Sequence, residues 1–466
     1  MNWRTDYLVV GGGAMAMAFV DVMLSDTDAT FTLVDRRDAP GGHWNDAYPF
    51  VRLHQPSAKY GAPSKHLGHD RKDEAGLNKG FYELASGAEV VRYYDELMRA
   101  FLASGRVRFL PVHDYVGGGE VRSLATGETE RIDVRRKLVD ATLMATSLPL
   151  THTRSFSVAD GVTCIAPNYL PEARPRFSRF AVLGAGKTAY DVLTWLLGEG
   201  VDPDAIAWVK PRDSWMINRA TTQPGLEYFD RTIGGLARQF EISATARSAR
   251  ELAQGFEEAG LWLRIDRSAD AELMHGATVS EAEVAALRRI ENVIRLGRVR
   301  AIDRGRVHLE QGGALMPGDV LYIDCTARGI DHARGAATPV FAGDVISLQM
   351  VRQFQPVFSA ALIGRVEASI DNEAEKRALS TVTPMTDTVE QWIPVQAQSI
   401  VNGGKWLANK GLRDWISACR LDWFGDTRAA IDPGDTEKLA VLARIRDTAP
   451  RAAMNLARLA ASARAA

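Results

Sequence analysis

The chain has 466 residues, 46% of them hydrophobic and 24% charged, a composition typical of a globular protein with room for about two to four domains. Lysine and arginine number 56 against 58 acidic residues, and the net charge of −2 argues against nucleic acid and against an anionic membrane as partners. The three cysteines, Cys164, Cys325 and Cys419, lie far apart without a CxxC pair, which excludes a metal knuckle or a redox dithiol and is typical of a reducing compartment.

The first predicted elements form a βαβ unit. A short apolar run at 6–10 stops at three glycines, a helical pattern follows from 14 to 24, and residues 31–35 (FTLVD) predict a second strand. The run before the glycines is too short for a signal peptide, and no window is long and apolar enough for a membrane helix. A cytoplasmic protein is therefore expected.

The turn between the first strand and the helix reads GxGxxA, with Gly11, Gly13 and Ala16 at its fixed positions. The first glycine allows a tight turn, the second lets a pyrophosphate approach the backbone, and the small third residue lets the helix pack on the strand. The helix N-terminus offers N–H groups to phosphates, and Asp35 at the end of the next strand can accept hydrogen bonds from a ribose. The pattern predicts a dinucleotide site.

The middle of the chain repeats this arrangement. Residues 91–105 predict a helix and 107–112 a strand, and 120–124 and 132–139 predict antiparallel strands around a turn at Gly127. A second GxGxxA turn, formed by Gly184, Gly186 and Ala189, follows a strand that starts at 179, and residues 205–211 predict the next strand. A second dinucleotide site is expected at this turn.

The strand after the second turn ends on cations rather than on an acid. Lys210 and Arg212 stand where NAD-binding proteins carry the ribose acid, and a cation there can pair with the 2′-phosphate of NADP. Both can instead be solvated loop charges. Asp213 follows directly and leaves NADH open as the coenzyme, and Arg219 is a weaker further candidate for phosphate binding.

The remaining elements are an insertion, a return to the sheet and a helical end. Residues 235–291 are mostly helical, and strands are predicted at 299–303, 306–310 and 320–326. From about 385 the pattern is helical, and the substrate pocket is expected among residues after 345. The tryptophans of this region are expected to belong to a helical core rather than to a substrate cage, and they are Trp392, Trp406, Trp415 and Trp423.

The segment after the first unit carries APGGHW at 39–44 and AYP at 47–49. With two GxGxxA turns in this order, the chain resembles the class B flavin-dependent monooxygenases, whose FAD motif continues into GGxW and Tyr-Pro. The resemblance implies FAD at the first site, although a loop with a core tryptophan would give the same letters. It also implies that the amide of Gln55 lies beside the reactive flavin carbon. His54 is either that polar group or an ordinary packed or solvated histidine.

The chain departs from that family at one motif. The family's FxGxxxHxxx(Y/W) is matched by residues 156–170, with Asn168 roughly where the histidine should fall. The stretches at 145–149 (ATSLP) and 324–329 (DCTARG) loosely match crossovers between the two domains, and the pair at 343–344 (Gly-Asp) suggests either a ribityl-binding residue pair or a simple turn. The departure weakens the prediction of oxygen insertion more than it weakens the predictions of fold and cofactors.

The expected fold class is α/β, with two Rossmann-like dinucleotide-binding domains, for FAD and then NADP, and a helical C-terminal region. The expected boundaries are 1–175 for the first part of the FAD domain, 176–325 for the NAD(P) domain with its helical insertion at about 235–291, 326–384 for the return to the FAD domain, and 385–466 for the helical region. The residues expected to bind the cofactors FAD and NADPH are Gly11, Gly13, Ala16, Asp35, Gly42, His43, Trp44, Gly184, Gly186, Lys187, Thr188, Lys210 and Arg212.

The expected function is that of an NADPH-dependent FAD monooxygenase, which acts on a small organic substrate with dioxygen through an oxygenated flavin. Gln55 and His54 are the candidate catalytic residues, and no metal is expected. The alternatives are an FAD-dependent NAD(P)H reductase or oxidase and a flavin-binding redox sensor without turnover. The sequence leaves a homo-oligomer open.

Overall fold

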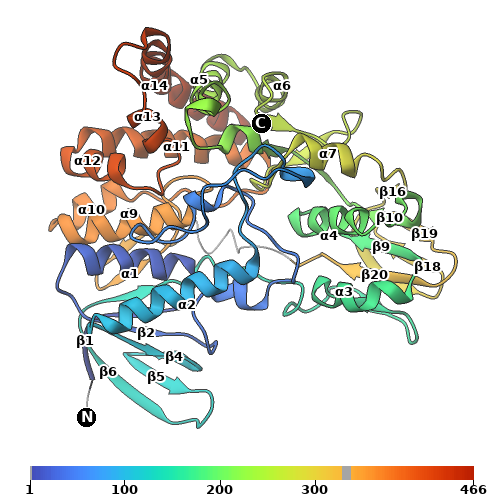
Figure 1. The fold of residues 1–466 in the computed structure, drawn as a ribbon, viewed down its shortest axis with the longest axis horizontal. Helices are drawn as coiled ribbons and strands as arrows, with labels where there is room; N and C mark the ends of the chain where they lie inside the picture. The colour runs from blue at the N-terminus through green and yellow to red at the C-terminus, as the bar shows by residue number, and fades with distance from the viewer. Residues whose placement is uncertain (1–2, 328–336, 466) are drawn as a thin grey trace.

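The computed structural model describes residues 3–327 and 337–465 of the chain, so the expected crossover at 324–329 lies partly outside the described residues. Two sheets of mainly parallel strands lie apart from each other, and helices from the middle and the end of the chain lie beside both (Figure 1). The expected α/β fold class with two Rossmann-like units and a helical C-terminal region is confirmed.

The first sheet has eight strands, and six of them follow the order β21-β22-β6-β1-β2-β3. Strands β1, β2, β3, β6 and β22 run parallel, and β4 and β5 form an antiparallel extension of β6, as the turn at Gly127 predicted. The strands of this sheet are β1 (Trp3–Val10), β2 (Phe31–Val34), β3 (Val107–Leu110), β4 (His113–Gly117), β5 (Glu120–Ser123), β6 (Thr129–Asp140), β21 (Phe341–Ala342) and β22 (Val345–Ser347).

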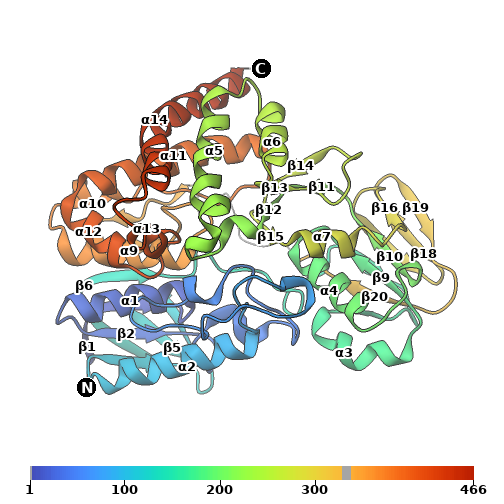
Figure 2. The same ribbon diagram turned by 45° about the horizontal axis from the view of Figure 1, so that its top comes forward.

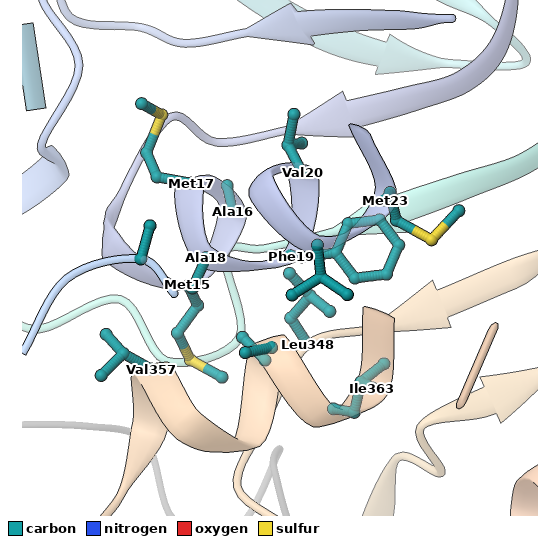
Figure 3. Packing of buried hydrophobic residues seen from close by; sticks show 14 of the residues in the cluster. Met15, Ala16, Met17, Ala18, Phe19, Val20, Met23, Leu348, Val357 and Ile363 are labelled. Carbon is teal, nitrogen blue, oxygen red and sulfur yellow. The ribbon is translucent and has the colours of Figure 1, made fainter. Parts of the chain in front are cut away.

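The helix that follows the first glycine turn, α1 (Ala14–Asp26), is covered on more than one side. It lies against the first sheet, and α9 (Pro356–Ser369), which is distant in sequence, packs on it, as Figure 3 shows for Phe19, Val357 and Ile363. A Cβ at Gly364 would lie 3.1 Å from the backbone oxygen of Phe19, so a small residue sets the helix spacing. This burial explains why residues 15–23 are almost all apolar instead of amphipathic.

The second sheet has five parallel strands in the order β16-β10-β9-β20-β8. They are β8 (Cys164–Ile165), β9 (Arg179–Leu183), β10 (Ile206–Val209), β16 (Val293–Ile294) and β20 (Val320–Asp324), and helix α4 (Lys187–Gly198) follows β9. A small sheet in the order β19-β18-β17-β7 lies beside them, made of β7 (Ser157–Val158), β17 (Val299–Asp303), β18 (Arg306–Leu309) and β19 (Gly312–Leu315). The chain leaves the first sheet after Asp140 and enters the second unit at β7 and β8, which agrees with the crossover expected at 145–149.

The segment between β10 and β16 contains the insertion predicted at about 235–291, and it is mainly helical, with short strands between its helices. Its elements are β11 (Asp213–Ser214), β12 (Met216–Asn218), α5 (Phe229–Thr245), α6 (Ala249–Glu258), β13 (Trp262–Leu263), β14 (Ala271–Leu273), β15 (Thr278–Val279) and α7 (Glu281–Leu287). The C-terminal helix α14 (Thr436–Ala465) packs on α5 and on α11 (Val389–Ala408), as Figure 2 shows. The insertion and the end of the chain therefore share one hydrophobic core, which includes Trp392.

The other helices are α2 (Gly87–Ala103), α3 (Leu170–Ala173), α10 (Glu373–Leu379), α12 (Lys410–Ala418) and α13 (Gly425–Ala429). Trp392 and Trp406 are buried in hydrophobic cores and Trp415 packs against one, which confirms the prediction of a helical core for these three residues. The residues Gly343 and Asp344 form the exposed turn of the β21–β22 hairpin, so the structure favours the interpretation as a simple turn. Within 3–327 and 337–465, no helix combines the length and the apolar character needed to cross a membrane.

Candidate functional site: two glycine turns and the junction between them

The first glycine turn lies at the carboxyl end of β1 and leads into α1. Gly11 has φ +98°, a conformation that favours glycine, and its N–H donates to the backbone oxygen of Val34 at 2.8 Å. Asp35, at the end of β2, accepts a hydrogen bond from the backbone N–H of Gly12 at 2.5 Å and another from that of Arg37 at 2.8 Å. The structure thus brings together the predicted glycines and the predicted acid at the start of a helix.

The GGxW segment packs directly on this turn. Gly41 donates from its N–H to the backbone oxygen of Gly12 at 2.9 Å, and a Cβ at Gly42, which has φ +59°, would lie 3.0 Å from the Cα of Gly13. The indole of Trp44 donates to the hydroxyl of Tyr60 at 2.7 Å. Glycine is therefore needed at position 42, whereas a Cβ at Gly13 would lie 3.7 Å from the Cα of Gly42, an ordinary contact.

His43 lies in the same segment, and its ring stacks on that of Trp44 with 5.2 Å between the centroids. Burial, together with the nearby Arg37, lowers the pKa of His43 to about 4. The imidazole is therefore neutral at neutral pH and adds no positive charge to the first turn.

The second glycine turn repeats the geometry of the first. It lies at the carboxyl end of β9 and leads into α4, whose N-terminal residue is Lys187. Gly184 has φ +128°, and a Cβ there would lie 2.5 Å from the backbone oxygen of Cys325, so only glycine fits. Gly186 is more open, because a Cβ there would meet no atom of the described residues within 4 Å.

The end of β10 differs from the sequence expectation at Lys210. Its side chain is 1% exposed, its ammonium group pairs with Asp213, and the ammonium lies 4.9 Å from the ring centroid of Trp208. The amine is thus neither a solvated loop charge nor free to bind a phosphate, and this part of the expectation is corrected. Arg212 is half-buried and makes no hydrogen bond or ion pair with the residues that the structure describes.

Asp213 is itself occupied on both carboxylate oxygens. Oδ1 pairs with Lys210, and Oδ2 accepts a hydrogen bond from Nε of Arg295 at 2.9 Å. Arg295 follows the neighbouring strand β16 and also donates to Asp266 at 2.7 Å. The expectation that Asp213 is available to a ribose therefore does not hold in this conformation.

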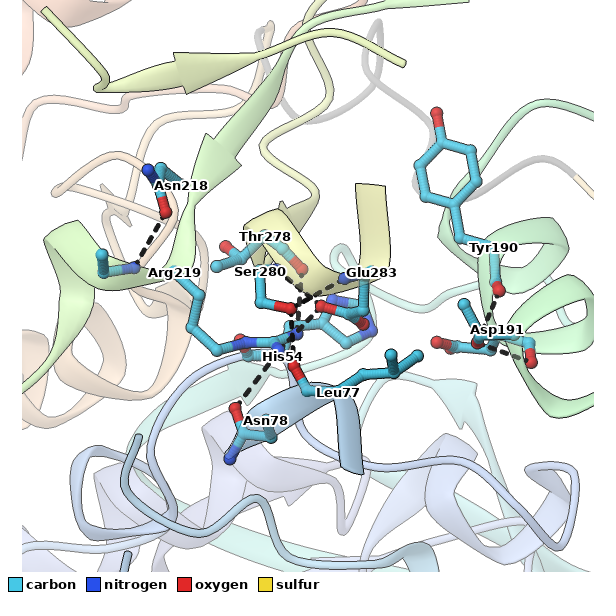
Figure 4. A network of polar contacts seen from close by, with 12 residues as sticks. His54, Leu77, Asn78, Tyr190, Asp191, Asn218, Arg219, Thr278, Ser280 and Glu283 are labelled. Atoms are coloured by element: carbon cyan, nitrogen blue, oxygen red, sulfur yellow. Dashed lines mark hydrogen bonds and ion pairs between the residues drawn. The ribbon is translucent and has the colours of Figure 1, made fainter. Parts of the chain in front are cut away.

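Buried polar residues join the two units. Arg219 is 2% exposed and pairs with Glu283 at 2.7 Å, and it donates to the backbone oxygen of His54 and to Asn78 Oδ1, each at 3.2 Å (Figure 4). Ser280 donates to the backbone oxygen of Leu77 at 2.7 Å. Arg219 is thus a link between the units, and not the phosphate ligand that the sequence suggested as a weaker candidate.

A second group of polar contacts reaches the start of α4. The hydroxyl of Tyr48 donates to Asp191 at 2.6 Å, and Asp191 also pairs with Lys187. Burial first, and then Asp191, raise the pKa of Tyr48 well above its usual value. Lys187, like Lys210, is already neutralised by a carboxylate, and Glu283 lies 3.8 Å from its ammonium group.

The candidate catalytic residues lie beside this junction. Burial first, and then Lys187 and Arg219, lower the pKa of His54 well below its usual value, so its ring is neutral. Gln55 follows His54, and its amide donates only a long hydrogen bond, 3.4 Å, to the backbone oxygen of Lys59. Asn168, which the resemblance aligned roughly with a histidine, donates to the backbone oxygen of Asp46 at 3.1 Å.

The residues present fit two dinucleotides. Each turn combines a glycine of positive φ with a helix N-terminus that has no side-chain cap among the described residues, so its N–H groups are open to phosphate oxygens. Side chains also bond the backbone of both turns, because Asp35 accepts from the N–H of Gly12 and the indole of Trp208 donates to the backbone oxygen of Gly184 at 2.8 Å. A separate cavity of about 410 Å³ lies in the helical region, and Trp215, Arg264, Asp270 and Val389 belong to its lining.

Sequence reasoning missed four residues of the site: Tyr48, Asp191, Glu283 and Arg295. Each of them acts through a partner distant in sequence, as in the pair of Tyr48 and Asp191, and such pairs leave no local pattern. The tyrosine stands in the AYP segment that carried the family resemblance, which is the one signal that could have drawn attention to it.

Two Rossmann-like units, each with a glycine turn at the carboxyl edge of its sheet, define the class of the chain. No protein-family model matches it. The chain is 42% identical over 424 residues to the uncharacterized protein Rv2000 of Mycobacterium tuberculosis, and the match covers 91% of this chain and 78% of that protein. The uncharacterized protein Mb2023 of Mycobacterium bovis matches to the same extent. The chain belongs to the family of these mycobacterial proteins.

Several solved structures resemble the chain at low sequence identity. An open structure of cyclohexanone monooxygenase is 16% identical, with a TM-score of 0.49, and the match covers 82% of this chain and 92% of that one. A polycyclic ketone monooxygenase from the fungus Thermothelomyces thermophila is 12% identical, with a TM-score of 0.48, and the match covers 97% of this chain and 85% of that one.

Proposed function

We propose that the chain is an NADPH-dependent FAD monooxygenase that acts on a small organic substrate. FAD would bind at the turn formed by Gly11 and Gly13, and NADPH at the turn formed by Gly184 and Gly186. The proposed FAD unit comprises 1–175 and 326–384, and the NADPH unit comprises 176–325. Bound FAD supplies the electron transfer and the reaction with dioxygen, and the protein supplies binding, orientation and exclusion of water.

The observation that supports this proposal is the polar junction between the two units. Tyr48 and His54 belong to the segment that follows the GGxW loop, and Asp191 and Arg219 belong to the segments that follow the second glycine turn. The contacts of 2.6 Å and 3.2 Å between them join the segments that follow the two glycine turns. Hydride transfer needs this proximity, because the donor and acceptor atoms have to approach closely.

The charges beside the two glycine turns are mostly balanced within the protein. His43 and His54 are neutral, and Lys187 pairs with Asp191. Arg212 is the cation at the end of β10 that makes no hydrogen bond or ion pair with the described residues, and its guanidinium can bind a 2′-phosphate with two hydrogen bonds. The amide of Gln55 is held weakly enough to turn toward a bound flavin.

Steady-state oxidation of NADPH by the flavin-loaded protein tests the proposal. A panel of small ketones and sulfides is added, and the peroxide released per NADPH is counted. A monooxygenase gives low peroxide and oxygenated product when a substrate is present. Peroxide in constant ratio to NADPH with every compound would instead identify an oxidase, and no consumption of NADPH would identify a binding protein without turnover. Either of these two results contradicts the proposal.

A further inference from the structure

The carboxylate of Asp213 is enclosed by two cations from different strands. Lys210 follows β10 directly, and Arg295 follows β16, the neighbour of β10 in the sheet. Asp213 is 6% exposed and Lys210 is 1% exposed, whereas Arg295 is only half-buried. A buried carboxylate with both oxygens occupied is held firmly in place, because its release would leave a buried lysine without a partner.

The charges of this cluster balance without any ligand. Lys210 and Arg295 carry two positive charges, and Asp213 and Asp266 carry two negative charges. Burial lowers the pKa of Lys210, and the hydrogen bond to Asp213 acts in the opposite direction. This opposing effect requires the two side chains to stay in close contact. Arg212 lies within the same short loop, and its positive charge is not paired with a carboxylate of this cluster.

We propose that Arg295 is a positioning residue for coenzyme choice, which favours NADPH by occupying Oδ2 of Asp213, the oxygen that Lys210 leaves open, so that this oxygen is not available to the adenosine ribose. The proposal rests on the NADPH site proposed above. A carboxylate oxygen in this loop that has no partner would accept a hydrogen bond from the ribose of NADH and would repel a 2′-phosphate. The chain thus has an acid that would suit NADH, Asp213, but pairs it with Arg295. The preference between NADPH and NADH then depends on Arg212.

The test compares the binding of NADP⁺ and NAD⁺ to the FAD-loaded protein by calorimetry. Arg295→Met keeps the length of the side chain but removes its charge, and it leaves the pair of Lys210 and Asp213 intact. The expected result is weaker binding of NADP⁺ and tighter binding of NAD⁺, with a change in their affinity ratio on the order of tenfold or more. Arg212→Met, in contrast, should weaken NADP⁺ binding without any gain for NAD⁺.

Further variants separate positioning from damage to the fold. Arg295→Lys retains a cation and should keep most of the preference for NADP⁺. Addition of Asp213→Asn to Arg295→Met should restore the preference, whereas addition of Asp266→Asn should not. Arg108→Met is the matched control, because Arg108 is a half-buried arginine that pairs with Glu130 at 2.6 Å in the other unit.

Two results would overturn the inference. The first is a parallel loss of both affinities, or no change, in Arg295→Met, and the second is rescue by Asp266→Asn instead of Asp213→Asn. Both leave the proposed function untouched if the unmutated protein binds NADP⁺. If the unmutated protein binds neither nucleotide, the NADPH site itself is wrong and this inference fails with it.

Discussion

Gly184 and Gly186 belong to one turn but meet different surroundings. Gly184→Ala forces a side chain into the left-handed conformation and against the backbone oxygen of Cys325 at 2.5 Å, so we expect a loss of about 2–4 kcal/mol in the free energy of unfolding. Gly186→Ala meets open space in the structure, and we expect it to cost less than about 1 kcal/mol while it weakens NADP⁺ binding. Urea unfolding and nucleotide titration of both variants check this. Equal losses of stability in the two variants would contradict the different roles assigned to Gly184 and Gly186.

His43 makes the stability of the protein depend on pH. Its pKa is about 4 in the folded chain and 6.5 in the unfolded chain, so the unfolded state binds a proton first as the pH falls. The contribution of the neutral imidazole to stability is therefore fully present above pH 6.5 and is lost progressively between 6.5 and about 4. Urea midpoints of the unmutated protein and of His43→Gln, measured across this range, should converge toward acidic pH. Parallel curves would show that His43 does not titrate as expected.

At the scale of elements, a C-terminal segment holds the loop that follows Gln55. Arg420 donates to the backbone oxygens of Ala62 at 3.0 Å and of Tyr60 at 2.7 Å, and the buried ammonium group of Lys59 donates to the backbone oxygen of Asp422 at 3.1 Å. Tyr60 in turn accepts the hydrogen bond of the Trp44 indole. The helical end of the chain thus supports the GGxW loop of the proposed flavin site.

We expect Arg420→Met to release this loop, because several buried carbonyl groups lose their donor at once. Hydrogen exchange over residues 55–66 should become faster, and the protein should retain less FAD after purification. Arg413→Met is the control, because Arg413 is more exposed and its hydrogen bond stays within its own segment, to the backbone oxygen of Leu407. Unchanged exchange in Arg420→Met would mean that the loop is held by its own contacts.

The elements themselves were largely predictable from the sequence. Glycine turns after short apolar runs predicted both strand–helix pairs, and the helix predicted at 14–24 is observed as Ala14–Asp26. The ion pairs were not predictable, because Lys59 meets Asp426 and Asp213 meets Arg295 only after the chain has folded. Lys210 shows the limit most clearly, since its position suggested a phosphate ligand while its burial makes it a partner of Asp213.

At the scale of the whole molecule, Arg219 joins the two units. Arg219→Met would leave Glu283 buried with Lys187 as its nearest cation, and we expect a loss of about 2–4 kcal/mol in the free energy of unfolding and slower reduction of the flavin by NADPH. Stopped-flow reduction and urea unfolding measure the two effects. Adding Glu283→Gln should restore part of the stability, because the uncompensated charge is removed. Strictly additive losses would show that Arg219 and Glu283 do not act as a pair.

The packing of α1 against α9 has a consequence for synthesis on the ribosome. Asp26 and Pro356 are 330 residues apart, and at typical translation rates the second helix emerges roughly 20–60 s after the first. During this interval, the apolar face of α1 that α9 will cover is exposed to other nascent chains and to chaperones. Strand β6 likewise lacks its parallel neighbour β22 until that strand has been synthesised. The N-terminal unit therefore reaches its final packing only after the second unit has been made.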